Sequence, residues 1–336
     1  MSLRRNSFPV NSLVGYGFWR RRVQKREYLR ICTVTLLVTG TLSPLIRETM
    51  RIALIGAAGQ LGTDLHRQLS GEVVPLTHAE IEVTRPESIE AMLDSVQPQM
   101  VVNTSAYNLV DKAETEYEAA MSVNAWGPRH LALACEKRNL KLVHISTDFV
   151  FGLESGSNSP RMETDLPGPQ SVYAASKLLG EYFVRSLCSR HFVIRTCGLY
   201  GQAATKAKGN FVLTMLRLAK EKPQLKVVSD QRCVPSYTRD VAEVIAALGK
   251  TEAYGLYHAT NSGDTSWFEV ATEAVRLAGL TTPILPITTS EFGAPAARPA
   301  YSVLNCSKIE RVTGLKLRPW KQALAAYLKE IGGIAE

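Results

Sequence analysis

From Met50 onward, short apolar runs alternate with longer stretches in which apolar residues recur every three or four positions. The short runs predict β-strands at 51–56, 73–76, 100–103, 141–146, 191–196 and 255–259. The longer stretches predict helices at 86–96, 116–138 and 173–188. Strands separated by helices are typical of βαβ units, which build a parallel sheet that is buried on both faces. The pattern therefore predicts a Rossmann-type, doubly wound α/β fold.

The pattern loosens beyond about residue 201. A helix is expected at 211–220 and a short strand at 226–229, and the segment 283–299 is rich in Pro, Thr and Ala. We interpret these as a smaller C-terminal substrate-binding lobe that is interleaved with the last strands. The expected domains are a dinucleotide-binding domain at 50–205 and, at 206–336, mainly the substrate lobe, with late strands of the main sheet at about 230–262.

Residues 1–49 differ from the rest of the chain in pattern and in charge. They hold nine Lys or Arg residues against two acidic residues, and their apolar run at 31–38 is far shorter than the roughly 20 residues of a membrane-spanning helix. Three interpretations stay open: a targeting peptide, a helix on a membrane surface, or an upstream start codon before a true start at Met50. We favour the last, because Met50 directly precedes the first strand, and we do not count this segment as part of the fold.

The formal net charge of +8 does not indicate a nucleic-acid-binding protein. Residues 1–49 contribute +7 of this charge, so the rest of the chain carries +1 and no basic face is expected there. The six cysteines are scattered without a CxxC pair, which indicates reduced thiols of a cytoplasmic protein and no metal site. We expect no membrane partner for the folded part.

A glycine-rich turn follows the first predicted strand. Gly56, Gly59 and Gly62 have the spacing GxxGxxG. The first glycine permits a tight turn, the second lets the backbone approach a pyrophosphate, and the third allows the helix to pack closely on the strand. Small residues at such a turn can be purely structural, but the strand before it and the leucines after it favour dinucleotide binding.

The end of the second strand bears on the choice of cofactor. An Asp or Glu at this place would hold the ribose of NAD, whereas this chain has Leu76, Thr77 and His78. The missing carboxylate favours NADPH. Glu80 and Glu82 are close enough in sequence to leave NADH open.

Tyr173 and Lys177 are the strongest catalytic candidates. Because they are four residues apart on a predicted helix, they share a face, and the ammonium should lower the pKa of the phenol toward neutral pH. The tyrosine could then exchange a proton with a substrate oxygen, although this spacing also occurs by chance. Thr147 follows the fourth strand, where ligands bind in open parallel sheets, and could hydrogen-bond the substrate or the phenol. The alternative for 146–148 is a capping turn.

Further motifs, in order along the chain, resemble those of one family. They are GAAGQLG at 56–62, VDKAE at 110–114, STDFVF at 146–151, YAASK at 173–177, NF at 210–211, TMLRLAKE at 214–221, SDQ at 229–231, RP at 298–299 and LN at 304–305. The chain thereby resembles the extended short-chain dehydrogenase/reductase superfamily and, within it, the dTDP-4-dehydrorhamnose reductases.

The resemblance implies that NADPH or NADH reduces the C4 keto group of a nucleotide-linked 4-keto-6-deoxy sugar, as in dTDP-L-rhamnose biosynthesis. Tyr173 would supply the proton, Lys177 would hold the nicotinamide ribose, and Thr147 would tune the phenol and contact the sugar. The implied cofactor contacts are Gly56, Gly59, Gln60, Leu61, Gly62, Glu82, Val83, Ser105, Ala106, Tyr107, Tyr173 and Lys177. The implied substrate contacts are Thr147, Asp148, Gly198, Asn210, Gln231 and Arg298. No motif implies a bound metal.

Two departures from the family pattern fall near the expected substrate. Where the family has Arg-Thr-Ser-Trp, this chain reads Arg-Thr-Cys-Gly at 195–198, which removes an aromatic contact to the sugar. Arg232 and Cys233 stand in a motif that is Gln-x-Gly in the family. We expect these changes to alter which sugar is accepted and to leave the chemistry unchanged.

Two other classes of protein stay open at this point. One is a nucleotide-sugar epimerase of the same superfamily, which would hold NAD tightly and consume none. The other is a non-catalytic, cofactor-binding regulatory subunit, such as that of methionine adenosyltransferase. The sequence also leaves a homodimer open.

Overall fold

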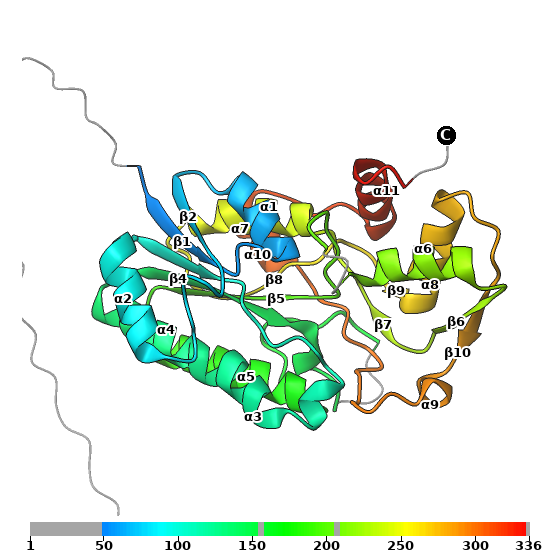
Figure 1. Ribbon diagram of the computed structural model, residues 1–336, viewed down its shortest axis with the longest axis horizontal. Coiled ribbons are helices and arrows are strands. Elements are labelled where there is room, and N and C mark those ends of the chain that lie inside the picture. Colours follow the sequence, from blue (N-terminus) through cyan, green and yellow to red (C-terminus); the bar gives the residue numbers. More distant parts are fainter. Residues whose placement is uncertain (1–48, 154–157, 205–208, 334–336) are drawn as a thin grey trace, which may run out of the picture. The chain divides into compact units, whose positions relative to one another are not determined.

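A six-stranded parallel sheet forms the centre of the molecule. The computed structural model describes residues 49–153, 158–204 and 209–333, so the interpretations offered for residues 1–48 lie outside the described part. The strands are β1 (Arg51–Ile55), β2 (Glu72–Leu76), β3 (Met100–Asn103), β4 (Lys141–Thr147), β5 (His191–Thr196) and β8 (Gly255–His258), in the order β2-β1-β3-β4-β5-β8. The chain passes from β2 at one side of β1 to β3 at its other side, so the strand order reverses between β1 and β3. In open parallel sheets, ligands bind beyond the carboxyl ends of the strands at this kind of reversal. The predicted doubly wound fold is confirmed (Figure 1).

Helices cover both faces of this sheet. On one face lie α1 (Gln60–Gln68), α7 (Thr238–Gly249) and α10 (Ser307–Thr313), and on the other lie α2 (Pro86–Val96), α4 (Gly127–Lys137) and α5 (Val172–Leu187) (Figure 1). Along β1, Ile52 and Leu54 join the first hydrophobic layer, whereas Ala53 and Ile55 join the second. This explains why the strands are apolar at consecutive positions: both of their faces are buried.

The predicted helix at 116–138 is interrupted by a π-helical turn. The structure divides it into α3 (Tyr117–Met121), the π turn η2 (Ser122–Trp126) and α4. Pro128 has no backbone N–H to donate to the carbonyl of Asn124, four residues earlier, so the regular α-helical bond is missing there. At the same point α5 packs closely, because a Cβ atom on Gly180 would lie 2.2 Å from the Asn124 oxygen. The apolar periodicity persisted through the turn, which is why the sequence pattern did not reveal it.

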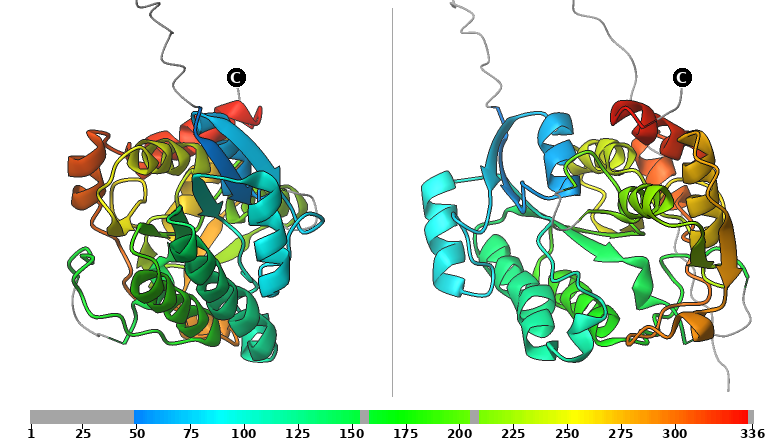
Figure 2. Two further views of the ribbon diagram at one scale, coloured as in Figure 1. Left: turned by 90° about the vertical axis from the view of Figure 1, so that its left-hand side faces the viewer. Right: turned by 45° about the vertical axis from the view of Figure 1, so that its right-hand side comes forward.

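A second, smaller lobe is built from C-terminal segments (Figure 2). Its elements are α6 (Phe211–Glu221), β6 (Leu225–Val228), β7 (Arg232–Cys233), β9 (Thr265–Ser266), α8 (Trp267–Leu277), β10 (Ile284–Ile287), α9 (Thr289–Phe292) and α11 (Trp320–Glu330). β6 pairs with β10 in parallel, β7 pairs with β9 in antiparallel fashion, and α6 packs on α8. The segment 283–299, expected only to be rich in Pro, Thr and Ala, thus contains a strand and a short helix.

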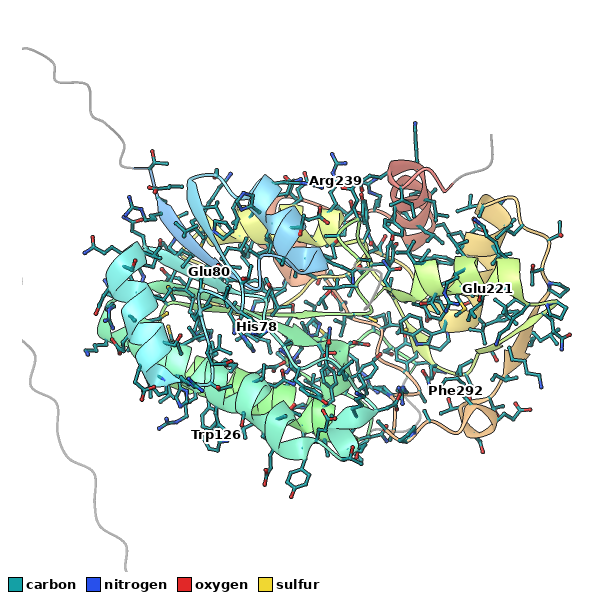
Figure 3. All side chains as sticks on the ribbon, viewed as in Figure 1. His78, Glu80, Trp126, Glu221, Arg239 and Phe292 are labelled. Carbon is teal, nitrogen blue, oxygen red and sulfur yellow. The ribbon has the colours of Figure 1, made fainter. Side chains whose placement is uncertain are left out.

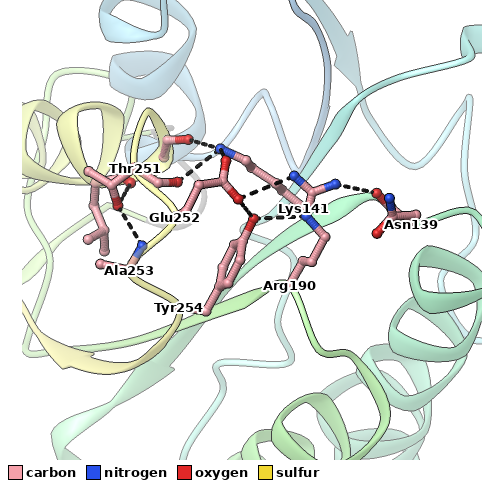
Figure 4. Close-up of polar contacts among 9 residues, drawn as sticks. Asn139, Lys141, Arg190, Thr251, Glu252, Ala253 and Tyr254 are labelled. Atoms are coloured by element: carbon pink, nitrogen blue, oxygen red, sulfur yellow. Dashed lines mark hydrogen bonds and ion pairs between the residues drawn. The ribbon is translucent and has the colours of Figure 1, made fainter. Parts of the chain in front are cut away.

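A charged cluster ties the amino-terminal end of β4 to the connection between α7 and β8 (Figure 4). The ammonium of Lys141 lies 2.8 Å from the carboxylate of Glu252 and donates to the carbonyls of Gly249 and Thr251. Arg190 reaches the same carboxylate at 3.3 Å. The hydrogen bond from Lys141 is the largest cause that lowers the pKa of Glu252 to about 2. The cluster lies at the end of the sheet opposite the ligand-binding edge, so we assign it a structural role.

Candidate active site

A long groove runs over the carboxyl ends of the strands. One cavity of about 620 Å³ extends from the glycine-rich turn past the end of β4 to the second lobe, and another of about 590 Å³ extends from the same turn over the end of β2. The two cavities share Gly59, Gln60, Thr104, Ala106 and Asn108. Figure 3 labels His78, which lines the second cavity, and Phe292, which lines the first.

The glycine-rich turn has the close contacts that its spacing predicted. Gly56 has φ +79°, and a Cβ atom there would lie 2.6 Å from the Thr104 hydroxyl. A Cβ atom on Gly62 would lie 2.2 Å from the Gly56 carbonyl oxygen. Gly59 is the N-cap of α1, so the amino terminus of this helix faces the groove, where it favours a bound phosphate. Leu61 lines the groove beside these glycines.

The end of β2 presents no carboxylate to the groove among the described residues. Thr77, His78 and Val83 line the second cavity. The carboxylate of Glu80 accepts hydrogen bonds from the backbone and hydroxyl of Thr77, both at 2.6 Å. The carboxylate of Glu82, expected to contact the cofactor, instead accepts hydrogen bonds from the backbone and hydroxyl of Thr84, at 3.0 and 2.8 Å. Short-range turns therefore hold both acids, and this edge favours the phosphorylated cofactor.

The segment after β3 contributes to the groove through two of its three predicted residues. Ser105 and Ala106 line the second cavity. The phenol of Tyr107 is instead hydrogen-bonded to Glu116, which raises the pKa of Tyr107 to about 12, and its ring is not part of either cavity wall. The backbone of Tyr107 exchanges two hydrogen bonds of 2.9 Å with the side chain of Asn124 in the π turn. Asn124 thus positions this segment, a role that the sequence reasoning missed because the π turn was not predicted.

Tyr173, Lys177 and Thr147 come together in the first cavity. Ser171 caps α5, so Tyr173 lies in its first turn and Lys177 one turn later. The hydroxyl of Thr147 at the end of β4 is a neighbour of the Tyr173 phenol and acts to lower its pKa. The buried ammonium of Lys177 donates to the Ile145 carbonyl at 2.6 Å. The helix and the strand therefore present the three groups to one space.

The pKa of Tyr173 differs from the sequence-based expectation. Burial is the largest influence and raises this pKa to about 12; Asp148 and Cys197 act in the same direction, whereas the hydrogen bond to Thr147 opposes it. The prediction that Lys177 lowers the phenol pKa is wrong for this arrangement, because the ammonium is directed to a carbonyl. Burial in turn lowers the pKa of Lys177 to about 8. A protonated phenol at neutral pH suits a proton donor.

A buried ion pair lies behind these residues. Glu181 is one turn beyond Lys177 on α5, and its carboxylate accepts two hydrogen bonds from Arg195 on β5, at 2.7 and 2.9 Å. The hydroxyl of Ser146 on β4 donates to the same carboxylate at 2.5 Å. This network joins α5, β4 and β5, which carry the candidate catalytic groups, and removing one partner would leave a buried charge unpaired.

The predicted substrate residues differ in whether they line the first cavity. Asp148, Gly198, Gln231 and Arg298 line it together with Thr147, whereas Asn210 does not. Burial raises the pKa of Asp148 to about 6, and its carboxylate accepts a hydrogen bond from Ser302 at 2.5 Å.

Arg298 makes a two-pronged ion pair with Asp111, at 2.7 and 2.9 Å. Gln231 donates to Thr289 at 3.0 Å. Both side chains therefore have protein partners at the edge of the cavity.

Asn210 is not brought to the cavity wall. Its oxygen caps α6, and its amide donates to the Gln60 side chain at 3.0 Å and to the Tyr327 hydroxyl at 2.9 Å. Gln60 also accepts a hydrogen bond from the backbone of Gly201 at 2.8 Å. Asn210 therefore links the glycine-rich turn to the second lobe, and its contact with substrate stays a prediction.

An aromatic side chain of the second lobe, Trp267, lies beside Gly198. A Cβ atom on Gly198, whose φ is +42°, would lie 2.7 Å from the tip of the Trp267 indole. Trp267, Phe211, Met215 and Lys226 all line the cavity. No sequence pattern predicts this contact, because Trp267 belongs to a helix far along the chain and packs near Gly198 only in the folded protein.

The fold, the glycine-rich turn and the Tyr173–Lys177 pair define a nucleotide-binding oxidoreductase of the short-chain dehydrogenase/reductase class. Residues 50–332 match the family described as RmlD substrate binding domain, and the chain belongs to this family.

Curated relatives support this membership. A spore coat polysaccharide biosynthesis protein of Bacillus subtilis is 40% identical over 283 residues, which cover 83% of this chain and 97% of the relative. A dTDP-4-dehydrorhamnose reductase of Aggregatibacter actinomycetemcomitans is 37% identical over 82% of this chain and 97% of its own length.

Solved structures agree with the sequence relatives. The dTDP-4-dehydrorhamnose reductase of Bacillus anthracis, solved in complex with NADP, has a TM-score of 0.79 and 36% identity, and the match covers 84% of this chain and 99% of that one. A UDP-glucose 4-epimerase of Thermus thermophilus has a TM-score of 0.72 at 21% identity, which shows the shared fold alone. The predicted resemblance is therefore confirmed.

Proposed function

We propose that this chain uses NADPH to reduce the C4 keto group of a dTDP-linked 4-keto-6-deoxy sugar, the reaction of dTDP-4-dehydrorhamnose reductases. The observation that carries this proposal is the meeting of Tyr173, Thr147 and Lys177 in the cavity that joins the glycine-rich turn to the second lobe. The names of the relatives and the family match support the same reaction.

The groove fits a dinucleotide. Gly56, Gly59 and Gly62 would lie against its pyrophosphate, and Ser105 and Ala106 would lie along its nicotinamide half. When bound, the reduced cofactor supplies a hydride. The edge at Thr77 and His78 favours NADPH over NADH, and the Bacillus anthracis relative was solved with NADP.

Tyr173 is the proton donor in the proposed mechanism. Its phenol is protonated at neutral pH, as an ordinary tyrosine is, and burial raises its pKa further, to about 12. As the C4 carbonyl carbon gains a hydride, its oxygen gains negative charge and takes the phenol proton. The neighbouring Thr147 hydroxyl, which acts to lower the phenol pKa, then stabilises the phenolate. Lys177 contributes a buried positive charge on the wall of the same cavity, and we assign to it the hold on the nicotinamide ribose.

The substrate is held by the second lobe. We assign residues 50–205 mainly to cofactor binding and 206–336 mainly to the substrate, with the segment 230–262 returning to the central sheet. Lys226 supplies positive charge on the cavity wall that suits a diphosphate, whereas the charge of Arg298 is balanced by Asp111. Asp148 and Gln231 supply hydrogen-bonding groups for the sugar.

One experiment separates this function from an epimerase and from a binding-only protein. The purified protein is assayed for NADPH and NADH oxidation with a panel of nucleotide-linked 4-keto sugars. We expect stoichiometric NADPH oxidation with the dTDP-linked 4-keto-6-deoxy sugar and slower use of NADH. An epimerase would purify with bound cofactor absorbance and oxidise none, and a regulatory subunit would bind NADPH without turnover.

We place the reaction in the cytoplasm and propose a homodimer. Among the described residues, no helix is both long and apolar enough to cross a membrane. The five described cysteines are free thiols, as in a reducing compartment. Trp126, Leu133 and Tyr182 are large apolar side chains exposed on the elements around α4 and α5, and they form a candidate dimer contact. Light scattering coupled to gel filtration tests this: a monomeric mass would contradict it.

A further inference from the structure

Gly198 and Trp267 pack closely against each other. Gly198 follows β5 and has φ +42°, a left-handed conformation that glycine adopts without strain. A Cβ atom there would lie 2.7 Å from Cη2 of the Trp267 indole and 3.2 Å from Cβ of Pro235. Any larger residue at 198 would therefore displace the indole. The absence of a side chain at 198 lets the indole of the second lobe approach β5.

The position of Trp267 is fixed by its own helix. Trp267 is the first residue of α8, which begins with a capping box formed by Ser266 and Glu269. Glu269 also pairs with Arg232 on β7 at 2.8 Å. On its other side the indole packs against the ring of Phe211, with 4.6 Å between the ring centroids. Capping, the ion pair and ring packing together hold the indole in place.

The indole faces the same cavity as the reacting groups. Gly198 directly follows Cys197, a buried neighbour of Asp148, and Asp148 directly follows Thr147. Trp267, Gly198, Thr147 and Tyr173 all line the 620 Å³ cavity. A ring that presents its carbonyl to Tyr173 would thus have the indole at its side.

We propose that Trp267 is a specificity-determining residue: its indole packs against the hexose ring of the nucleotide-linked substrate and sets which sugars are accepted. This inference rests on the proposed function. The C–H groups of a hexose ring form an apolar face that packs well on an aromatic surface. Trp267 makes no proton transfer, so it acts on binding, and its removal changes KM far more than kcat.

The first test combines turnover with fluorescence. Trp267→Phe and Trp267→Leu are compared with the wild type and with Trp126→Phe, an exposed tryptophan outside the cavity walls. We expect Trp267→Leu to raise KM for the dTDP-linked 4-keto-6-deoxy sugar by roughly 10-fold while kcat changes less than about 2-fold. Titration with dTDP-L-rhamnose should change the tryptophan emission of the wild type and of Trp126→Phe, but not of Trp267→Phe. Titration with dTDP, which lacks the sugar, should leave the emission unchanged.

The second test moves the indole without replacing it. Gly198→Ala places a methyl group against Cη2 and should raise KM in the same direction as Trp267→Leu. Gly314→Ala is the matched control, because Gly314 has φ +72° and nothing within 4 Å of an added Cβ atom. It carries the backbone strain without the contact and should leave KM unchanged.

Several results would overturn the inference. One is an unchanged KM in Trp267→Leu. Another is an emission change on dTDP alone that equals the change with dTDP-L-rhamnose, because this would place the indole against the base. A third is an emission change that persists in Trp267→Phe. Failure of the wild type to turn over any 4-keto sugar would instead contradict the proposed function, and the dTDP-L-rhamnose titration would still decide the role of Trp267. If the wild type does not respond to dTDP-L-rhamnose either, both proposals fall.

Discussion

The pKa values of Tyr173 and Lys177 determine which protons the site can donate at working pH. Burial raises the pKa of Tyr173 to about 12, so its phenol carries a proton for reduction at neutral pH, and it lowers the pKa of Lys177 to about 8, near working pH. The sequence predicted both residues but had the electrostatics of the phenol reversed. Spacing shows which groups share a helix face, whereas desolvation depends on everything that packs around them.

Replacing Tyr173 by Phe should abolish reduction and preserve cofactor binding. The ring remains while the positioned proton donor is lost, and such a loss costs roughly 10² to 10⁴-fold in rate. Turnover is measured by NADPH oxidation and binding by NADPH fluorescence. Wild-type turnover in this variant would remove Tyr173 from the mechanism.

The pH dependence should report on Lys177. Its ammonium is charged below a pKa of about 8 and neutral above it, so kcat/KM should fall as pH rises through about 8. The lowered pKa of Lys177 also affects stability: as pH rises, kcat/KM falls but the free energy of unfolding increases. Because the folded-state pKa lies below the ordinary 10.5, the unfolded chain binds more protons between these values, and this group's contribution to stability rises with pH across that window.

Lys177→Arg provides the control for this profile. A guanidinium remains charged throughout the range, so the alkaline decline of kcat/KM should disappear even if the rate is lower. If the alkaline decline of kcat/KM persists unchanged in Lys177→Arg, a group other than Lys177 causes it.

At the scale of elements, the site depends on how α5 packs against the π turn. Helix α5 carries Tyr173 and Lys177, and Gly180 lets it approach the carbonyl of Asn124. Asn124 in turn holds the backbone of Tyr107 beside the groove and donates to the hydroxyl of Ser176 at 3.0 Å. One close contact thus couples the catalytic helix to the cofactor-side segment.

Gly180→Ala should damage both stability and activity. A methyl group 2.2 Å from a backbone oxygen cannot be accommodated without moving α5, and overpacking of this kind costs about 1–3 kcal/mol. A shift of about 1 Å in the catalytic pair lowers the rate by roughly 100-fold. Chemical denaturation and kcat/KM measure the two effects.

Gly249→Ala is the matched control at the end of α7. Its added methyl would meet only the flexible Met100 side chain, at 3.3 Å, and alanine favours helix by about 1 kcal/mol over glycine. It should be neutral or stabilising, with normal turnover. If Gly180→Ala and Gly249→Ala have equal effects on stability and turnover, the close approach of Gly180 to the Asn124 carbonyl does not position the catalytic residues.

Sequence predictability differs between these elements for physical reasons. The buried parallel strands were placed to within a residue or two, because continuous apolar runs bounded by turns have a strong signature. The π turn at 122–126 was missed since its apolar pattern continues the helix on either side. Trp267 and Asn124 were missed as site residues because their roles arise from packing between segments far apart in the chain.

At the scale of the molecule, residues 1–49 hold most of the excess positive charge, and the pattern of strands and helices begins at Met50. We therefore expect a protein that begins at Met50 to be as soluble and active as the full chain. Expression yield, thermal unfolding and kcat/KM of the two forms test this. If the shorter protein fails to fold, or if cell fractionation finds the full chain on membranes because of its first segment, the interpretation of Met50 as the true start is wrong.

The central claim is that hydride passes to C4 of a nucleotide-linked sugar while Tyr173 supplies the proton. The most direct measurement uses NADPH with both hydrogens at C4 of the nicotinamide replaced by deuterium, a dTDP-linked 4-keto-6-deoxy sugar and mass and NMR analysis of the product. We predict one deuterium, at C4 of the sugar, with wild-type protein and no labelled product with Tyr173→Phe. Unlabelled product, or deuterium at another carbon, would contradict the account.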